Sequence, residues 1–442
     1  MTAVVTSDAP APEGALAQRP RLPRPLLTEL RRGVGPWTGA ATTAVVAFAM
    51  YSKAGYLGGW QNHWTDATDL LRITAALLCG PLAVAAGCWH GGRERRRRTT
   101  AWLGSLPRGP LSRTLVAAAP AALWPAAGYL AAATGCLLAT WPYAGGDSPH
   151  LALVAADAVT LASLGTLGFV VGRLVAWRFT APLLAVLTYV GLGYPSYSEA
   201  DARWLDPAIQ HNYAWDRPAW WFGAASIVWA GGLAAAALLA YAARRRTTAL
   251  VPLTAACAAA VLIAQTGDGL WRPDPEATRR VCDDGTPQVC LPYAERHLLP
   301  EASAALAGLN ARLRGIPGAP TRWVVGPGGR AAGDLELPNP SFEAIRGKLT
   351  SPDAYAANGV SALLSETCAQ NDYDAPDWER ASAVNSAVFA WLSPAEGQGP
   401  YIGPAEQGHL TRLEAKSPAE ARTYLTRYLA ADPCTAAEVP LP

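Results

Sequence analysis

The segment GGRERRRRTTAWLGSLPRGP (residues 91–110) decides the fold class, because it places four consecutive arginines, Arg95–Arg98, between two of the most apolar stretches of the chain. The whole sequence is unusually apolar for its length. Of its 442 residues, 51% are hydrophobic and only 16% are charged, and the mean hydropathy is +0.11. An ordinary soluble protein of this size is more polar. We therefore expect an integral membrane protein in which the basic segment is a loop between two spans.

Seven apolar runs are close to the roughly 20 residues that a helix needs to cross about 30 Å of hydrocarbon. Only helices satisfy their own backbone groups in lipid, so all seven are expected to be helical despite their prolines. The runs are 37–57, 70–90, 114–141, 151–174, 179–195, 219–241 and 249–266. The expected fold is thus an all-α polytopic membrane protein with about seven transmembrane helices (37–267), followed by a mainly α, disulfide-containing extracytoplasmic domain (268–442).

Arginine in short loops predicts which side of the membrane is cytoplasmic. If the N-terminus is inside, the inner segments carry seventeen arginines, whereas the outer loops 58–69, 142–150 and 196–218 carry only Arg203 and Arg217. We therefore expect a multi-pass protein of a bacterial cytoplasmic membrane. Residues 1–20 would be a disordered cytoplasmic tail, and the chain beyond 267 would be extracytoplasmic. The alternative is that 179–195 forms a re-entrant hairpin, which would leave six spans and a cytoplasmic C-terminal domain.

Cysteine placement favours the first topology. Cys282, Cys290, Cys368 and Cys434 all follow the last apolar run. An even number of cysteines in one polar domain indicates two disulfides, which persist on the oxidising side of a membrane. We favour Cys282–Cys290 across the turn DDGTPQ, which leaves Cys368–Cys434. Four unpaired thiols are the alternative, and a metal site is disfavoured because no C-x-x-C or neighbouring histidine accompanies them.

The C-terminal region carries the patterns of a soluble domain. Leucines spaced by about 3.6 residues predict a helix over 293–314 with one buried face. SPAE (417–420) is a capping box that opens a helix to about Ala431. Two more helices are expected at 352–368 and 376–392. TRWVV (321–325) and DLEL (334–337) are expected to pair as a small hairpin across a Gly-Pro-rich turn.

The loop 91–110 has two interpretations. Its arginines could simply anchor the topology near anionic lipid headgroups, at about 1 kcal/mol per basic side chain. The following residues, however, place Trp102, Leu103 and Leu106 on a short amphipathic turn that ends at Pro107. An apolar spot on a cytoplasmic loop needs lipid or a protein partner to cover it. We therefore expect this loop to dock a partner.

The layout resembles the permease subunits of ABC-2-type transporters, particularly actinobacterial ones with an extra extracytoplasmic domain. PRPLLTELRRGVGPW (23–37) matches the family's amphipathic elbow helix, here 21–36. RRRRTTAWLGSLPR (95–108) matches the position and character of the coupling helix that inserts into the ATPase subunit. Two more stretches match the family's short extracytoplasmic helices and the tail of the actinobacterial members, respectively 194–221 and 290–323. The seventh span and the long tail depart from the plain six-span permease.

The resemblance implies a membrane-spanning permease subunit that moves an unidentified substrate with ATP hydrolysed by a separate ATPase subunit. It also implies a homodimer or a pair of related permeases in the lipid bilayer. The residues it assigns to ATPase docking are Arg95, Arg96, Arg97, Arg98, Trp102, Leu103 and Leu106. The alternative is a membrane-anchored extracytoplasmic receptor or accessory protein without transport activity of its own.

No motif indicates an enzyme, a cofactor, a metal site or a nucleic-acid partner. GPGGRAAGD (326–334) is glycine-rich but lacks the lysine of a phosphate-binding loop. The six histidines are scattered and form no H-E-x-x-H motif. His297 is therefore expected to be a solvated helix residue rather than a catalytic base.

Asp157 is the ionisable residue that stands out within the apolar runs. A carboxylate at such depth is costly and normally faces a helix interface or a water-filled cavity. It would then face a substrate or a proton; alternatively, it is hydrated near the outer membrane surface. Lys53 and Arg72, near the ends of spans, are expected to reach that surface. GFVVG (168–172) has the small-x-x-x-small spacing that allows close helix packing and permits a dimer seam.

Overall fold

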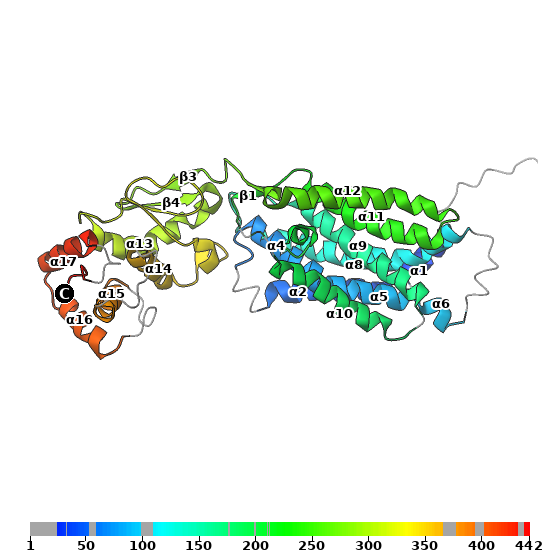
Figure 1. Cartoon of the computed structure of the whole chain (residues 1–442), viewed down its shortest axis with the longest axis horizontal. Coiled ribbons are helices and arrows are strands. Elements are labelled where there is room, and N and C mark those ends of the chain that lie inside the picture. The colour runs from blue at the N-terminus through cyan, green and yellow to red at the C-terminus, as the bar shows by residue number, and fades with distance from the viewer. Residues whose placement is uncertain are drawn as a thin grey trace, which may run out of the picture.

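The computed structural model describes residues 24–31, 33–52, 59–98, 109–175, 177–198, 200–209, 211, 213–365, 377–393, 402–431 and 437–442. Figure 1 shows two parts arranged end to end: a helical bundle and a C-terminal domain that extends from one end of it. We call this the domain-facing end of the bundle. The opposite end carries α1 (Arg24–Arg31) and α6 (Arg93–Arg96).

The bundle is built from the predicted apolar runs. Its longer elements are α2 (Gly35–Tyr51), α4 (Trp64–Thr74), a π-helical turn (Ala75–Cys79), α5 (Gly80–Gly91), α8 (Pro110–Thr140), α9 (Leu151–Leu174), α10 (Thr180–Gly193), α11 (Phe222–Ala242) and α12 (Leu250–Thr266). Short 3-10 turns lie at Tyr194–Tyr197, Asp201–Leu205, Arg246–Ala249 and Gly267–Leu270. The described residues of the runs are therefore mainly helical, as their composition predicts, and residues 53–57 of the first run lie outside the described residues.

Five helical stretches of the described chain are long and apolar enough to cross a membrane. They are Trp64–Gly91, Pro110–Thr140, Leu151–Leu174, Phe222–Ala242 and Arg246–Leu270. Two other apolar helices are shorter: α2 has 17 residues and α10 has 14. The molecule is thus mostly helical, and its bundle has the composition of a membrane-embedded part.

Helix α9 lies at the centre of the bundle, against α5, α8 and α11. Glycines let it approach α5 closely: a Cβ added to Gly168 would lie 2.1 Å from the Val84 carbonyl oxygen, and one added to Gly172 would lie 2.1 Å from that of Cys88. The close packing predicted from GFVVG is therefore confirmed. These glycines face α5 of the same chain, so this contact does not leave them free as a dimer seam.

The C-terminal domain combines a four-stranded sheet with helices. The strands β3 (Arg280–Cys282), β4 (Gln288–Pro292), β5 (Arg322–Val324) and β6 (Asp334–Glu336) are ordered 3-4-5-6. The helices are α13 (Leu299–Leu313), α14 (Pro352–Ser365), α15 (Trp378–Leu392), α16 (Pro404–Glu414) and α17 (Pro418–Ala430), and 3-10 turns lie at Tyr293–Leu298 and Pro340–Glu343. A small ribbon joins β7 (Ala344–Ile345) and β8 (Lys348–Leu349). Trp323, Leu306 and Tyr355 are fully buried in the core between these elements.

Two features of this domain differ from the prediction. Strands β5 and β6 do pair, but in parallel, with Arg322 opposite Asp334. The predicted hairpin is wrong. Residues 325–333 cross back over the sheet before β6 begins, so β6 runs in the same direction as β5, whereas a tight turn would have reversed it. Helix α16 was also not predicted, because its sequence has no strong apolar periodicity. The capping box at Ser417 and Glu420 is present, as predicted.

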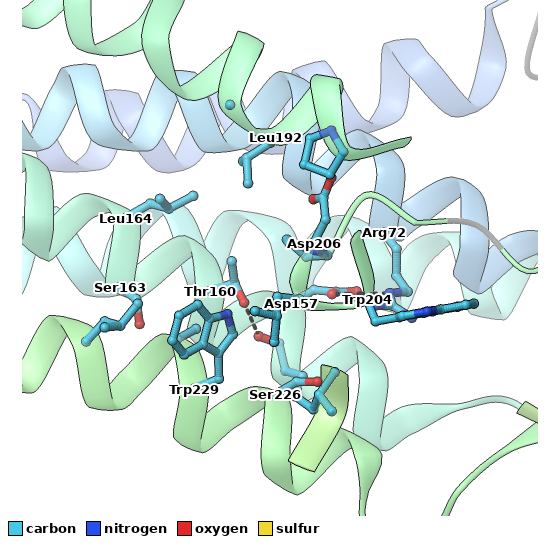
Figure 2. A pocket seen from close by; sticks show the side chains of 18 of the residues that line it. Arg72, Asp157, Thr160, Ser163, Leu164, Leu192, Trp204, Asp206, Ser226 and Trp229 are labelled. Carbon is cyan, nitrogen blue, oxygen red and sulfur yellow. Dashed lines mark hydrogen bonds and ion pairs between the residues drawn. The ribbon is translucent and has the colours of Figure 1, made fainter. Parts of the chain in front are cut away.

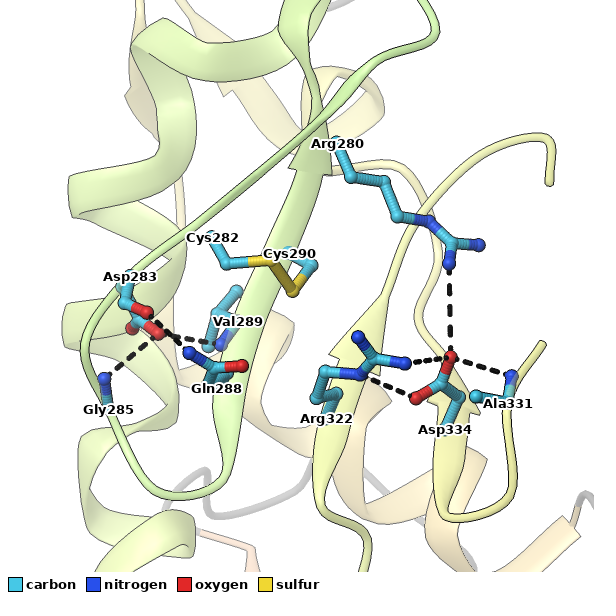
Figure 3. Close-up of a disulfide and its surroundings, with 10 residues drawn as sticks. All are labelled: Arg280, Cys282, Asp283, Gly285, Gln288, Val289, Cys290, Arg322, Ala331 and Asp334. Atoms are coloured by element: carbon cyan, nitrogen blue, oxygen red, sulfur yellow. Dashed lines mark hydrogen bonds and ion pairs between the residues drawn. A yellow bond between two sulfur atoms is a disulfide. The ribbon is translucent and has the colours of Figure 1, made fainter. Parts of the chain in front are cut away.

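The sulfur atoms of Cys282 and Cys290 lie at disulfide-bonding distance, 2.01 Å (Figure 3). The two cysteines face each other across β3 and β4, as the favoured pairing requires. Asp283 stabilises the turn between them, because its Oδ1 accepts hydrogen bonds from the backbone N–H of Gly285 (3.1 Å) and Val289 (2.8 Å). Cys368 and Cys434 lie outside the described residues, so their pairing stays a prediction.

Candidate functional site

A pocket of about 290 Å³ lies in the half of the bundle nearer the C-terminal domain, and Figure 2 shows the side chains that line it. Helix α9 forms its floor, and α10 and α11 form its sides. The segment between α10 and α11 covers it, through Trp204, Leu205 and Asp206. Most of the wall is aliphatic or aromatic, and charged groups are concentrated near the cover.

Asp157 lies in this pocket and forms an ion pair with Arg72 of α4. Asp157 Oδ1 is 3.6 Å from Arg72 Nε, and the two side chains are only 3% and 6% exposed. The hydroxyl of Tyr129 donates a hydrogen bond to Asp157 Oδ2 at 3.2 Å. Arg72 therefore points into the bundle rather than reaching the membrane surface, and its guanidinium lies 5.6 Å from the centre of the Phe222 ring. The expectation that Arg72 snorkels is wrong, because a buried carboxylate from α9 lies within its reach.

Asp206 is the second carboxylate of the pocket. Its Oδ1 accepts a hydrogen bond from the Ala208 backbone N–H at 2.9 Å, whereas its buried Oδ2 has no hydrogen-bond partner among the described residues. Burial raises the pKa of Asp206 to about 6, against the opposing effects of the Ala208 hydrogen bond and the Arg72 charge. At neutral pH this carboxylate is therefore mostly ionised.

Contacts on both sides hold the covering segment in place. The backbone N–H of His211 donates to Asp69 Oδ2 of α4 at 3.0 Å. The His211 ring stacks on Trp271 with centroids 4.5 Å apart, and its Nε2 lies 2.6 Å from Asp216 Oδ2. Strand β1 (Asp216–Pro218) pairs with β2 (Trp271–Pro273), which follows α12. The cover is thus tied to α4 and to the start of the C-terminal domain.

A second polar cluster joins the bundle to the C-terminal domain. His63 Nε2 lies 3.1 Å from Glu295 Oε2, and both side chains are completely buried. Asn339 Nδ2 donates to the other Glu295 oxygen at 2.7 Å. Asn62 Nδ2 donates to the backbone carbonyl of Ala344 at 2.6 Å, and Asn62 Oδ1 accepts from the backbone N–H of Gly347 at 3.0 Å. The domain is therefore docked through buried polar contacts.

The surroundings of this joint shift the pKa values of two histidines in opposite directions. Burial disfavours the charged form of His63, but the charge of Glu295 and the hydrogen bond between them prevail and raise the pKa of His63 to about 10. Burial and the neighbouring positive charge of His63 lower the pKa of His297 to about 4. The His297 ring packs edge-on against His63 with centroids 5.0 Å apart, and neither ring nitrogen has a hydrogen-bond partner among the described residues. The expectation that His297 is solvated is wrong, because the residue lies at the joint.

The loop predicted to dock the ATPase lies at the opposite end of the bundle, where several of its charged residues contact the rest of the chain. Arg93 Nη2 lies 2.8 Å from Glu29 Oε2 of α1, and Glu94 forms a close ion pair with Arg173 at the end of α9. Two of the predicted docking arginines also contact the chain itself: Arg95 donates to the Arg173 carbonyl, and the Arg96 guanidinium lies 4.1 Å from the centre of a Trp89 ring.

Arg97 and Arg98, the remaining two arginines of the run, are exposed. Trp102, Leu103 and Leu106 lie outside the described residues, so the apolar part of the predicted docking site stays a prediction.

Comparisons with known proteins provide no family: no family model, no curated protein and no solved structure matches this chain. Within the described ranges, no group of three histidine, cysteine, aspartate or glutamate side chains is arranged to hold a metal ion. The site is therefore interpreted from its own chemistry.

Proposed function

We propose that this chain is the membrane-spanning permease subunit of an ABC-type transporter, which moves a substrate across a bacterial cytoplasmic membrane with ATP hydrolysed by a separate subunit. The observation that carries the proposal is the buried ion pair of Arg72 and Asp157 at the pocket between α9, α10 and α11. Charged groups inside a membrane bundle are expensive and do not by themselves stabilise it. Their presence at a pocket favours a role in handling the polar part of a substrate.

The proposed topology has seven spans, with α2 and α10 crossing the membrane in addition to the five longer stretches. The N-terminus would be cytoplasmic and the C-terminal domain extracytoplasmic. Two observations support this orientation: the arginine-bearing α6 lies at the end opposite the C-terminal domain, and a cysteine pair at bonding distance lies within that domain. Protease added to intact cells should cleave the chain beyond residue 270. Protection until the membrane is opened would contradict the orientation.

The proposed ATPase docks on the loop 91–110. The Glu29–Arg93 and Glu94–Arg173 ion pairs support this role, because they connect the first turn of the loop to α1 and α9. Arg173 follows Asp157 by sixteen positions in α9, which is about 24 Å of helix. A displacement of the loop would therefore act directly on α9, the helix that carries Asp157.

Co-purification tests the docking proposal. Replacing Trp102, Leu103 and Leu106 with serine should abolish co-purification with an ATPase encoded beside this chain, while membrane insertion is kept. Trp141→Ser is the matched control, because Trp141 is 71% exposed and follows α8 at the other end of the bundle. Unchanged co-purification of the triple variant would contradict the docking role.

The second candidate is a membrane-anchored receptor or accessory protein. The buried joint at His63, Asn62 and Glu295 favours it, because a domain docked in this way can pass a binding event to α4. A neighbouring gene for a histidine kinase, without an ATPase gene, would support this candidate over the permease.

A further inference from the structure

The pocket has an apolar end and a polar end. Helix α10 packs mainly on α5, whereas α11 packs on α9 and α12, so the pocket occupies the groove between α10 and α11. Figure 2 shows Leu192 on the α10 side, Trp229 and Ser226 on the α11 side, and Asp157 between them. Its volume of about 290 Å³ is just below the range of about 300–1,000 Å³ for pockets that bind drug-sized molecules, which suits a small ligand.

The charges that line the pocket do not cancel. The charge of Arg72 is opposed by Asp157 at 3.6 Å. Asp206 is 6% exposed and its Oδ2 is unpaired, and no second lysine or arginine lines the pocket in the described part of the chain. Arg203 lies nearby but pairs with Asp268 at 3.7 Å and is not part of the lining. The uncompensated charge is therefore negative.

The aromatic walls favour the same kind of ligand. Trp229 lines the pocket together with Asp206. Trp204 and Phe222 also line it, but their rings already contact arginines: the Arg203 guanidinium lies 4.8 Å from the centre of the Trp204 ring and the Arg72 guanidinium 5.6 Å from that of Phe222. The face of an aromatic ring attracts a cation, most strongly for tryptophan. The remaining wall is aliphatic, as at Leu164 and Leu233, and would contact an apolar chain or ring.

We propose that this pocket binds an amphiphilic organic cation, with the cationic group at Asp206 and the apolar part along the groove between α10 and α11. That such a cation is the cargo rests on the proposed transport function, whereas its binding does not. An anionic or neutral amphiphile of the same length would leave the Asp206 carboxylate without a partner.

The test uses the full chain in lipid nanodiscs and three ligands with matched chains: n-octyltrimethylammonium, n-nonanoate and n-nonanol. Isothermal titration calorimetry, with empty nanodiscs as the blank, should give a Kd for the cation about tenfold lower than for either other ligand. Equal affinity for the three ligands, or tighter binding of nonanoate, would overturn the proposal. This comparison needs no variant, so it does not depend on the folding of a mutant.

Two variants locate the binding. Asp206→Asn should weaken binding of the cation about tenfold, whereas Asp201→Asn should leave it unchanged, because Asp201 is exposed on the same segment and lies outside the pocket lining. Trp229→Leu should weaken binding of the cation and leave nonanol unaffected. Unchanged binding in Asp206→Asn would overturn the assignment of the site. The two proposals can fail separately. If the chain binds the cation but does not co-purify with an ATPase, the transport function is contradicted and the binding site is kept. If it co-purifies with an ATPase but does not bind the cation, the binding site is contradicted and the transport function is kept.

Discussion

His63 and Glu295 form a fully buried ion pair between the helical bundle and the C-terminal domain, with 3.1 Å between Nε2 and Oε2. His63 lies immediately before α4, which also carries Arg72 of the pocket. The domain and the charged pocket are therefore connected through one helix. A change in the position of the domain would act on α4 and on its ion pair with α9.

Breaking this buried pair should loosen the C-terminal domain. Glu295→Gln leaves His63 without its carboxylate partner, and removing one member of a buried ion pair typically costs about 3–5 kcal/mol. We expect faster hydrogen–deuterium exchange at 341–347, where Asn62 contacts the domain. Glu276→Gln, at an exposed position, is the control. Unchanged exchange in Glu295→Gln would show that the pair does not hold the joint.

Two histidines of the joint should give it opposite pH dependences, His63 above pH 6.5 and His297 below it. The raised pKa of His63, about 10, gives a contribution that is complete below 6.5 and is lost as the pH rises toward 10. The lowered pKa of His297, about 4, gives a contribution that is complete above 6.5 and is lost as the pH falls toward 4. The lowered pKa of Glu295 adds to the loss at acid pH, below 4.5.

Exchange at 341–347, measured from pH 4 to pH 10 and corrected for its intrinsic rate, tests this profile. His63→Gln should remove the alkaline loss, and His297→Gln should reduce the acid loss. Asp66 and Asp147 also face His63 and are unchanged in both variants, so the difference between the variants reports the two histidines. A profile that is the same in all three proteins would refute the assignment.

Removing Arg72 should destabilise the bundle, because Asp157 would stay buried with only the Tyr129 hydroxyl as a partner. We expect Arg72→Met to lower the free energy of unfolding by about 3–5 kcal/mol. The double variant Arg72→Met with Asp157→Leu should recover much of the loss, since apolar groups of similar volume often replace a buried pair without penalty. Thermal unfolding of the purified protein measures both. A single variant as stable as the original chain would contradict the role of the ion pair.

Glycine substitutions should separate helix packing from helix propensity. Gly168→Ala brings a methyl group against the Val84 carbonyl of α5, whereas Gly135→Ala on α8 meets no atom within 4 Å. We expect the first to destabilise by about 1–3 kcal/mol and the second to be neutral or stabilising by up to about 1 kcal/mol. The measurement is thermal unfolding in one detergent. Equal effects at the two positions would mean that the α5–α9 contact is not tight.

Loss of the Cys282–Cys290 bond should destabilise the C-terminal domain. The two residues are separated by eight positions, and closing so short a loop is worth about 2.5 kcal/mol in the chain-entropy description. Cys282→Ser with Cys290→Ser should therefore make the domain more sensitive to protease. In intact cells, a membrane-impermeant maleimide should label Cys282 only after reduction. Labelling without reduction would show that the bond is absent.

Several features could be predicted from local sequence because their causes are local. Helix α9 begins and ends where its apolar run does, at 151 and 174, since the length of such a run sets the length of the helix. The start of α17 follows from the Ser417–Glu420 capping box, and the Cys282–Cys290 pair follows from a short turn between two strands. Asp157 could be singled out because a carboxylate inside an apolar run is costly.

Other features depend on which distant residues the fold brings together. Asp157 and Arg72 are on different helices, and Glu295 follows its partner His63 by 232 positions. The three consecutive polar residues Gln61–His63, just before a span, were the sequence feature that could have indicated a contact with another part of the chain. They do not indicate which residues of the C-terminal domain they contact. Sequence alone determined the apolar helices and the Ser417–Glu420 cap of α17, since those depend on neighbouring residues. Only the tertiary structure decided the ion pairs, the parallel pairing of β5 and β6, and the carboxylate at the pocket cover, because these depend on the packing of separate segments.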